Sequence, residues 1–292
     1  MRECETEPPE KDWAEPVAGD LLARGIVRPG LCLFLGAGDT GKTFLAAALA
    51  NQLTAGGPIA FVDADIGQSH IGPPATVGLA LRDRPCGGLA AVAPAAIAFV
   101  GDITPVGHML QFAAAIARCV AAVRDKADIT LIDTPGLVSG GAAVSLWWAV
   151  HRILRPSTII ALRREDEIDP ILAGLTCFDT HIERLRTPAS LRTKSSEQRR
   201  RHRLCLFADY FASAALRTLD LAEVAVQTGR NTGRGDTVNR LVALSNRAGD
   251  DLSLGLLKEL DGDQMTATVL TPLADTSQVR CLTIGDITVE SS

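Results

Sequence analysis

Aromatic residues are scarce in this chain, at 4% of 292 residues, and tyrosine occurs only once. The core must therefore be filled mainly by Ala, Leu, Val and Ile, within a hydrophobic content of 47%. That content is typical of a globular protein. A chain of this length can bury a substantial core, either in one large domain or in two smaller ones.

The chain also lacks a C-x-x-C pair. Its seven cysteines are scattered between Cys4 and Cys281. This spacing argues against a cysteine-rich zinc site and against a disulfide framework. It is typical of proteins from a reducing compartment.

Long apolar runs and a signal sequence are missing as well. No run reaches the roughly 18 apolar residues that a membrane helix needs. Residues 1–20 are acidic and contain prolines, whereas a signal peptide begins with basic residues followed by an apolar segment. We therefore expect no membrane partner, a cytoplasmic location and a mobile acidic tail over residues 1–20.

An excess of positive charge is absent too. The 29 Lys and Arg residues are outnumbered by 34 Asp and Glu residues, which gives a formal net charge of −5. A globally acidic chain is not a general coat for nucleic acid, although a local basic patch can still bind it.

From residue 31 onward, short apolar runs alternate with segments of helical pattern. Each run is apolar throughout, which is typical of parallel strands covered on both faces. This alternation predicts an α/β fold, a parallel sheet with helices on both faces. The predicted strands are Leu31–Leu35, Ile59–Val62, Ile97–Val100, Ile129–Ile132 and Thr158–Leu162, and the predicted helices are Phe44–Leu53, 108–124 and 142–154.

The first strand leads into "GAGDTGKT", which fits the P-loop pattern G-x-x-x-x-G-K-[ST]. Its glycines let backbone N–H groups turn toward phosphate oxygens, and the following helix directs its positive end at the same anion. Lys42 would reach the β- and γ-phosphates, and Thr43 would offer its hydroxyl to Mg²⁺. The predicted nucleotide-binding residues are Gly36, Ala37, Gly38, Asp39, Thr40, Gly41, Lys42 and Thr43.

The fourth predicted strand ends in "TLIDTPG". Asp133 stands where a Walker B acid would hold a metal-bound water. The same letters are compatible with the D-x-x-G switch of a GTPase. The chain has no N-K-x-D motif to read guanine, however, which disfavours a GTPase.

The second predicted strand ends in "DADIGQSHIGPP". A kinase needs a group that orients and deprotonates the accepting hydroxyl near the γ-phosphate, and Asp63 and Asp65 are well placed for this. Gln68 can donate and accept hydrogen bonds, which suits a phosphate or a sugar hydroxyl. We expect His70 to line this loop and His108 to lie at a helix start, rather than either acting as a base.

Together these motifs resemble the polynucleotide 5′-hydroxyl kinase family, which includes the kinase of the eukaryotic pre-mRNA cleavage factor and tRNA splicing complex. It also includes the kinase of ribosomal RNA processing and relatives from archaea and bacteria. The pairing of a G-K-T loop with D-x-D-x-G-Q is the most specific feature. The resemblance continues through "FVGDITPVGH", "LIDTPGLVSGGA", "RPSTIIALRREDEIDPIL" and "KSSEQRRRHRLCLFADYF", with a weaker echo in residues 271–289.

The resemblance implies ATP and Mg²⁺ as cofactors and a nucleic acid with a 5′-hydroxyl end, RNA or DNA, as partner. It implies that Asp65 lies near the accepting hydroxyl and the metal, so that Thr43, Asp65 and Asp133 are the predicted metal-site residues. Lys42, Asp65 and Arg199 are the predicted catalytic residues. Substrate would be held by Gln68, by the clasp over Thr134, Gly136 and Leu137, and by Lys194.

Two positions depart from the family's pattern. The clasp motif T-x-G-W ends in Leu137 instead of tryptophan, and the first lid arginine is Lys194. An aromatic side chain stacks on a base, and lysine loses the bidentate fork of arginine. Trp147 and Trp148 are expected in the core or at an interface.

Past residue 175 the composition of the sequence changes. Residues 184–203 hold eight Lys or Arg and one acid, and short apolar runs broken by Gly, Asp and Asn follow from about Val238. We predict a P-loop kinase domain over 21–215, with a basic helical lid at about 184–211, and a small β-rich domain over 216–292.

The predicted function is ATP-dependent phosphorylation of polynucleotide 5′-hydroxyl ends. Two alternatives stay open at this point. One is an ATP-binding P-loop scaffold of an RNA-processing assembly with little phosphoryl transfer, and the other is an ATPase or GTPase of RNP maturation. The choice between RNA and DNA, the preferred nucleotide base and the oligomeric state are also open.

Overall fold

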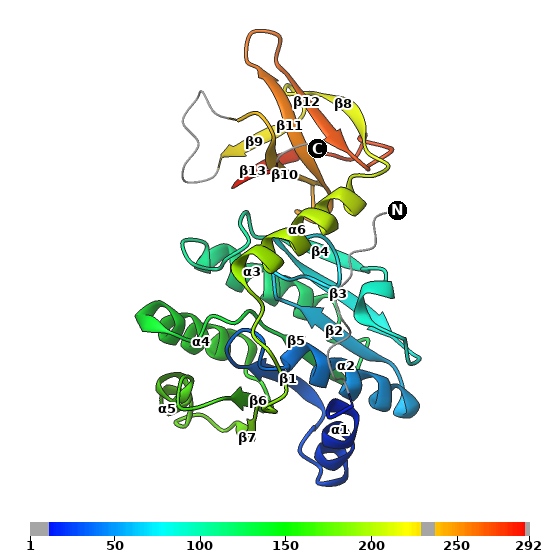
Figure 1. Cartoon of the computed structure of the whole chain (residues 1–292). Helices are drawn as coiled ribbons and strands as arrows, with labels where there is room; N and C mark the ends of the chain where they lie inside the picture. Colours follow the sequence, from blue (N-terminus) through cyan, green and yellow to red (C-terminus); the bar gives the residue numbers. More distant parts are fainter. Residues whose placement is uncertain (1–11, 229–236, 290–292) are drawn as a thin grey trace.

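The computed structural model describes residues 12–228 and 237–289 of the chain. Figure 1 shows an α/β unit with a smaller β-rich unit at one end of it, and helix α6 running between the two. The α/β and β-rich parts share a continuous path of hydrogen-bonded strands.

Five parallel strands form the centre of the α/β unit, in the spatial order β7-β6-β1-β5-β2. Four of them were predicted from their apolar runs, and the predicted α/β class is confirmed. The parallel strands are β1 (Gly30–Leu35), β2 (Ile59–Asp63), β5 (Ile129–Asp133), β6 (Thr158–Arg163) and β7 (His181–Arg186).

Two further strands, β3 (Thr76–Arg82) and β4 (Ala96–Phe99), extend the sheet, β3 antiparallel to β2 and β4 antiparallel to β3. The run 97–100 therefore has the direction of the parallel strands, as predicted, but it pairs with an antiparallel neighbour instead of a parallel one. The physical reason is the connection: β2, β3 and β4 follow one another without an α-helix, and a parallel neighbour needs a long crossover.

Helices cover both faces of the sheet. One core cluster joins the sheet to α3 (Met109–Ala121), α4 (Gly140–Leu154) and the short α5 (Asp169–Leu175). It includes Trp147, which is fully buried, whereas Trp148 is partly exposed. The opposite cluster joins the sheet to α1 (Ala14–Ala23) and α2 (Lys42–Leu53).

The helix α1 corrects the predicted tail over residues 1–20. Ala14, Ala18 and Leu21 are buried against α2, so residues 14–20 belong to the packed core. These three residues share one face of the helix, while Glu15 and Asp20 are exposed, which reconciles an acidic composition with a packed helix. Residues 1–11 lie outside the described residues.

The described residues of the C-terminal unit form six strands, and the predicted β-rich character is confirmed. They are β8 (Ala215–Asp220), β9 (Ala225–Thr228), β10 (Arg240–Ser245), β11 (Asp251–Asp261), β12 (Thr266–Thr271) and β13 (Cys281–Thr288). The predicted boundary at 215/216 falls at the start of β8. A bridge between β11 and β4 joins the two units, and Asp251 accepts a hydrogen bond from the N–H of Phe99.

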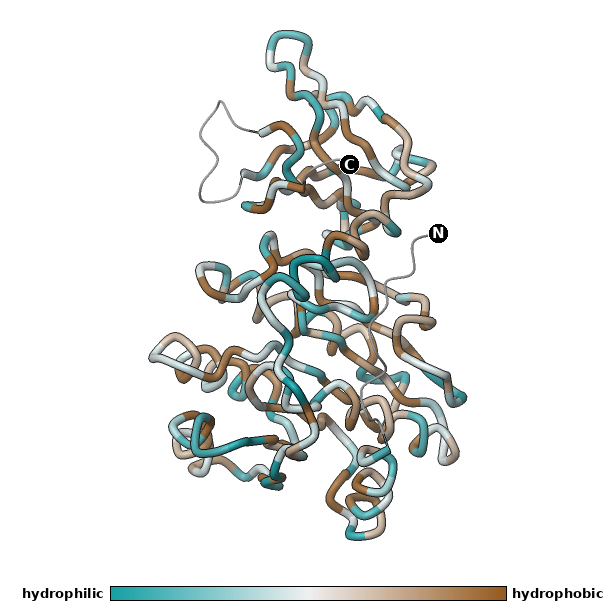
Figure 2. The backbone as a smooth tube through the Cα atoms, viewed as in Figure 1, coloured by the Kyte–Doolittle hydropathy of each residue, from teal (hydrophilic) through white to brown (hydrophobic). Residues whose placement is uncertain are grey.

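Helix α6 (Ser196–Tyr210) begins beside the P-loop and ends in the C-terminal unit. A capping box starts it, in which Ser195 and Gln198 bond each other's backbone N–H groups. At its other end Phe207 is buried, and the Tyr210 hydroxyl pairs with Ser253 at 3.0 Å. Figure 2 shows that the segment leading into α6 is mostly hydrophilic, as expected for the predicted basic lid.

His108 directly precedes α3, as predicted, and its Nε2 lies 2.9 Å from a carboxylate oxygen of Asp286 on β13. Within the described ranges, no helix has the length and apolar content required to span a bilayer.

We expect Leu21→Ala to lower the free energy of unfolding by roughly 2–5 kcal/mol, because it removes a fully buried side chain from the contact with α2. Denaturant titration measures the change. Leu22→Ala is the matched control. The Leu22 side chain is only partly buried, so its removal should lower the free energy of unfolding clearly less. Equal, small losses for both variants would contradict a packed α1.

Candidate functional site

The P-loop connects β1 to α2 and is folded tightly around Lys42. The Nζ of Lys42 donates to the carbonyl oxygens of Gly36 at 2.9 Å and Ala37 at 2.8 Å. The lysine is 5% exposed, and burial lowers its pKa although nearby carboxylates act in the opposite direction. The loop therefore holds its positive charge inside a cradle of backbone groups, as a phosphate site requires.

Thr43 and Asp133 meet at the start of α2. The Thr43 hydroxyl donates to Asp133 Oδ2 at 2.5 Å, and the N–H of Thr134 donates to the other carboxylate oxygen at 3.0 Å. Asp133 is fully buried, and it lies opposite Asp63 in the register of β5 and β2. Burial raises the pKa of both acids, the charge of Asp65 raises both further, and the charge of Asp63 also raises the pKa of Asp133.

The donor set fits Mg²⁺. Hydroxyl and carboxylate oxygens are the hard ligands that this ion prefers, and it keeps waters and substrate phosphates as further ligands. No group of three His, Cys, Asp or Glu side chains converges in the part of the chain that the structure describes. Thr43 and Asp133 would hold the ion, and Asp65 stays a predicted third residue.

Asp63 organises the loop that follows β2. One carboxylate oxygen accepts from the N–H groups of His70 at 2.6 Å and Ile71 at 2.9 Å, and the other accepts from Asp65 at 3.1 Å. The residue is fully buried. Both of its carboxylate oxygens are therefore engaged by the backbone of the loop, inside the protein.

Asp65 is only partly buried, and its described hydrogen bonds all go to one oxygen. That oxygen, Oδ1, accepts from the N–H groups of Gly67 at 3.2 Å and Gln68 at 3.1 Å. Gln68 lies beneath α6, where its amide nitrogen is 3.4 Å from the carbonyl of Arg199, and its Oε1 has no partner among the described residues. The two acids of D-x-D-x-G-Q therefore have different environments: Asp65 keeps an oxygen available and Asp63 does not.

The lid brings Arg199 to the P-loop. Its guanidinium pairs with Asp39 Oδ2 at 2.5 Å and lies beside Gly38. The same carboxylate oxygen accepts a hydrogen bond from the backbone N–H of Lys194 at 2.8 Å. Lys194 itself is exposed. Of the two predicted lid residues, only Arg199 contacts the P-loop through its side chain.

The predicted clasp residues are largely engaged inside the protein. The Thr134 hydroxyl is buried and donates to the carbonyl of Phe34 at 2.5 Å. Leu137 packs against the core, and its carbonyl accepts from Trp147 Nε1 at 2.7 Å. Gly136 lies against the P-loop: a Cβ there would stand 2.4 Å from the backbone nitrogen of Gly38. Substrate binding by these residues stays a prediction.

Sequence reasoning did not single out two residues of the lid. Arg203 interacts electrostatically with Asp65 and with Arg199, and His202 lies close to His70, with ring centroids 6.4 Å apart. Arg203 follows Arg199 by four residues and so lies on the same face of the helix, a signal that was present in the sequence. The contact between His202 and His70 had no local signal.

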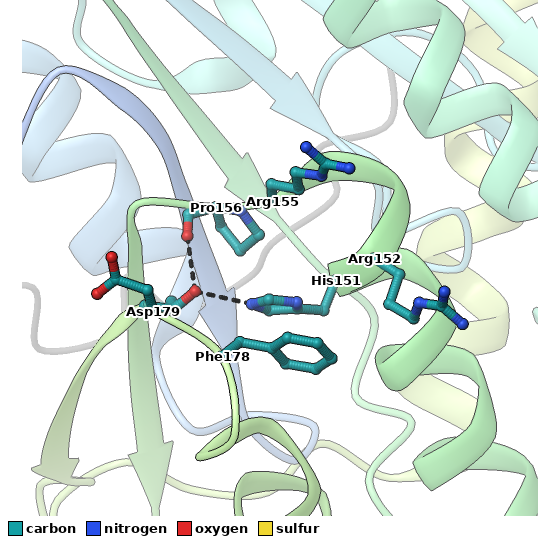
Figure 3. Close-up of a pocket in the computed structure, with 7 residues that line it drawn as sticks. His151, Arg152, Arg155, Pro156, Phe178 and Asp179 are labelled. Atoms are coloured by element: carbon teal, nitrogen blue, oxygen red, sulfur yellow. Dashed lines mark hydrogen bonds between the residues drawn. The ribbon is translucent and has the colours of Figure 1, made fainter.

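A hollow of about 400 Å³ lies elsewhere, where α4 ends and β6 begins (Figure 3). His151 stacks on Phe178 there at 4.2 Å and pairs with Thr180 at 2.8 Å. The hollow is at the amino end of the parallel strands, whereas the P-loop, Asp63 and Asp133 are at their carboxyl ends. It is therefore not part of the site described above.

Comparisons with known proteins point to one family. The family model described as mRNA cleavage and polyadenylation factor CLP1 P-loop matches residues 36–213. A polyribonucleotide 5′-hydroxyl-kinase of Pyrococcus furiosus is 28% identical over 317 residues, which cover 90% of this chain and 88% of that protein. One of Methanocaldococcus jannaschii is 32% identical over 202 residues, 68% of this chain and 55% of that protein.

A solved structure has the same fold. The structure of a wild-type Clp1p–Pcf11p complex aligns with a TM-score of 0.69 over 95% of this chain and 78% of that chain. The sequence identity is 12%, so the likeness concerns the fold alone.

We expect Gly136→Ala to weaken ATP binding by roughly 5- to 150-fold, because the added methyl group would displace the P-loop at Gly38 at an overpacking cost of about 1–3 kcal/mol. Titration of the protein with ATP measures the affinity. Gly141→Ala is the control, since a Cβ at that position meets open space. A Gly136→Ala variant with unchanged affinity would show that the contact does not shape the loop.

Proposed function

The chain belongs to the CLP1 P-loop family, and on this premise we propose that it is an ATP-dependent polynucleotide 5′-hydroxyl kinase. It would transfer the γ-phosphate of ATP to the 5′-hydroxyl end of RNA or DNA. The relatives named polyribonucleotide 5′-hydroxyl-kinase support this activity. A cytoplasmic location remains part of the proposal, supported by the scattered cysteines of the sequence.

The observation that carries the proposal is the convergence of three elements. The P-loop, the loop after β2 and the start of α6 meet around Lys42, Asp65 and Arg199. The carboxylates of Asp65 and Asp133 both raise the pKa of Lys42 through their charge, so all three groups share one site. A site for a phosphate donor and a carboxylate for the acceptor therefore face each other under one lid.

Each residue then has a defined task. Lys42 and the loop amides bind the β- and γ-phosphates, and Thr43 and Asp133 hold Mg²⁺, which supplies positive charge to the phosphates when bound. Asp65 accepts the proton of the 5′-hydroxyl while the hydroxyl oxygen forms a bond to the γ-phosphorus. The bond from that phosphorus to the bridging oxygen breaks, and ADP leaves.

Arg199 would change partner during this reaction. Asp39 holds its guanidinium at the edge of the P-loop, where the transferring phosphoryl group passes. An arginine at this place stabilises the negative charge of the transition state. Asp39 would then act as a resting partner that keeps the guanidinium close to the phosphates.

The second candidate is an ATP-binding scaffold with little phosphoryl transfer. Two observations favour it: Leu137 packs against the core, and the side chain of Lys194 does not contact the P-loop through any described hydrogen bond or ion pair. Asp65 and Arg199 favour the kinase, because a scaffold needs neither an acceptor carboxylate nor a lid arginine.

We expect label to pass from γ-labelled ATP to a 5′-hydroxyl oligonucleotide, and Lys42→Ala to abolish this transfer while the protein stays folded. Gel analysis of the oligonucleotide measures transfer, and circular dichroism checks the fold. Release of labelled phosphate without labelling of the oligonucleotide would instead indicate an ATPase. ATP binding with no transfer or hydrolysis would indicate the scaffold.

The two acids should respond differently to substitution. Asp65→Asn should lower kcat by roughly 10²- to 10⁴-fold, the usual contribution of a positioned base, with little effect on unfolding. Asp63→Asn should mainly reduce stability, by roughly 1–3 kcal/mol, because its new NH₂ group would face a backbone N–H.

Saturating kinetics and thermal unfolding of both variants separate these effects. If Asp63→Asn loses kcat at unchanged stability, or Asp65→Asn keeps a normal kcat, the assigned roles are wrong.

A further inference from the structure

Two histidines from distant parts of the chain meet where the loop after β2 contacts the lid. His70 lies in the loop after β2, and His202 lies on α6. Their ring centroids are 6.4 Å apart and the rings are tilted by 46°. Neither ring was assigned a role in phosphoryl transfer above.

Both histidines belong to elements that also carry residues of the proposed acceptor site. The backbone N–H of His70 is held by Asp63, two residues before Asp65. His202 immediately precedes Arg203, whose charge interacts with Asp65. The two rings therefore meet where the loop after β2 contacts the lid, on the same two elements that carry Asp65 and Arg203.

The terminal nucleoside of a substrate needs a surface for its base, and Leu137 offers little. Leu137 packs against the core instead of standing in the site. Among the tryptophans, Trp13 lies against Gly41 of the P-loop, Trp147 is fully buried, and Trp148 lies beside Phe178 at the opposite end of the strands. Unpaired bases are commonly stacked on aromatic side chains, histidine among them.

The state of the rings suits stacking. Burial lowers the pKa of His202 to about 4, with further contributions from His70, Lys194 and Arg203. His202 is therefore uncharged near neutral pH and presents an aromatic face. Its imidazole is also partly exposed, so a base can reach it.

We propose that His70 and His202 stack against the 5′-terminal nucleobase of the polynucleotide, in place of an aromatic clasp residue. This proposal rests on the proposed kinase function. The loop after β2 supplies one ring and α6 supplies the other, and together they form the surface against which the base stacks.

The experiment compares two 5′-hydroxyl oligonucleotides that differ only at the first nucleoside, which is intact in one and abasic in the other. For the wild-type protein, KM should be roughly tenfold lower for the intact oligonucleotide, within the range that stacking of one base gives. His202→Ala and His70→Ala should each reduce this preference to about twofold or less. His202→Phe should restore it, and KM for ATP should not change.

The ratio between the two oligonucleotides distinguishes stacking from a structural effect. A displaced lid would lower kcat for both substrates equally, whereas lost stacking raises KM for the intact one alone. His181→Ala is the control, because this histidine lies on β7 beside Glu183 and outside the site. Wild-type preference for the intact base in both alanine variants would overturn the proposal.

Failure of the kinase function would be recognised separately. If the wild-type protein phosphorylates neither oligonucleotide, fluorescence anisotropy of the same two oligonucleotides measures binding directly. A preference for the intact base that His202→Ala removes would support the stacking pair even then. Equal binding of both oligonucleotides by the wild-type protein would reject it.

Discussion

The site depends on two carboxylates that are buried side by side. The parallel pairing of β2 and β5 places Asp63 opposite Asp133, and neither is exposed. Burial of like charges is costly unless each is hydrogen-bonded or neutralised. Asp63 is satisfied by three backbone N–H groups, which fixes the loop that carries Asp65. Asp133 is satisfied by Thr43, by a backbone N–H and by the charge of Lys42, which fixes the start of α2.

The lid is fixed by contacts far from the phosphates. Phe207 is buried in a cluster shared with the C-terminal unit, and Tyr210 donates to or accepts from Ser253 while its oxygen also accepts from the N–H of Leu254. Burial raises the pKa of this tyrosine, so it stays protonated. Arg199 therefore reaches the P-loop because the other end of its helix is anchored on the β-rich unit.

Much of this arrangement could be predicted from local patterns. The runs that became β1, β2, β5 and β6 are apolar throughout, and the P-loop spacing needs no tertiary information. By contrast, β7 is an edge strand whose residues are mostly half-buried or exposed, so it lacked a clear apolar signal. The acids among residues 14–20 favour a tail in the sequence, because the apolar face of this helix is narrow.

The different roles of the two acids of D-x-D-x-G-Q could not be predicted from a local pattern. Both acids stand at a strand end, and the sequence places them two residues apart. They differ because the backbone N–H groups of His70 and Ile71 donate to Asp63. These hydrogen bonds depend on the path of the whole loop. The approach of His202 to His70 depends in turn on how α6 crosses the sheet, over a separation of more than a hundred residues.

The capping box at Ser195 and the anchor at Tyr210 together make α6 a helix of fixed length. Each residue of a helix turns the chain by about 100°. One residue added or lost between the two ends would therefore swing Arg199 and His202 away from the sheet, even with every side chain retained. This segment should accordingly tolerate substitution of its exposed residues far better than it tolerates a change of length.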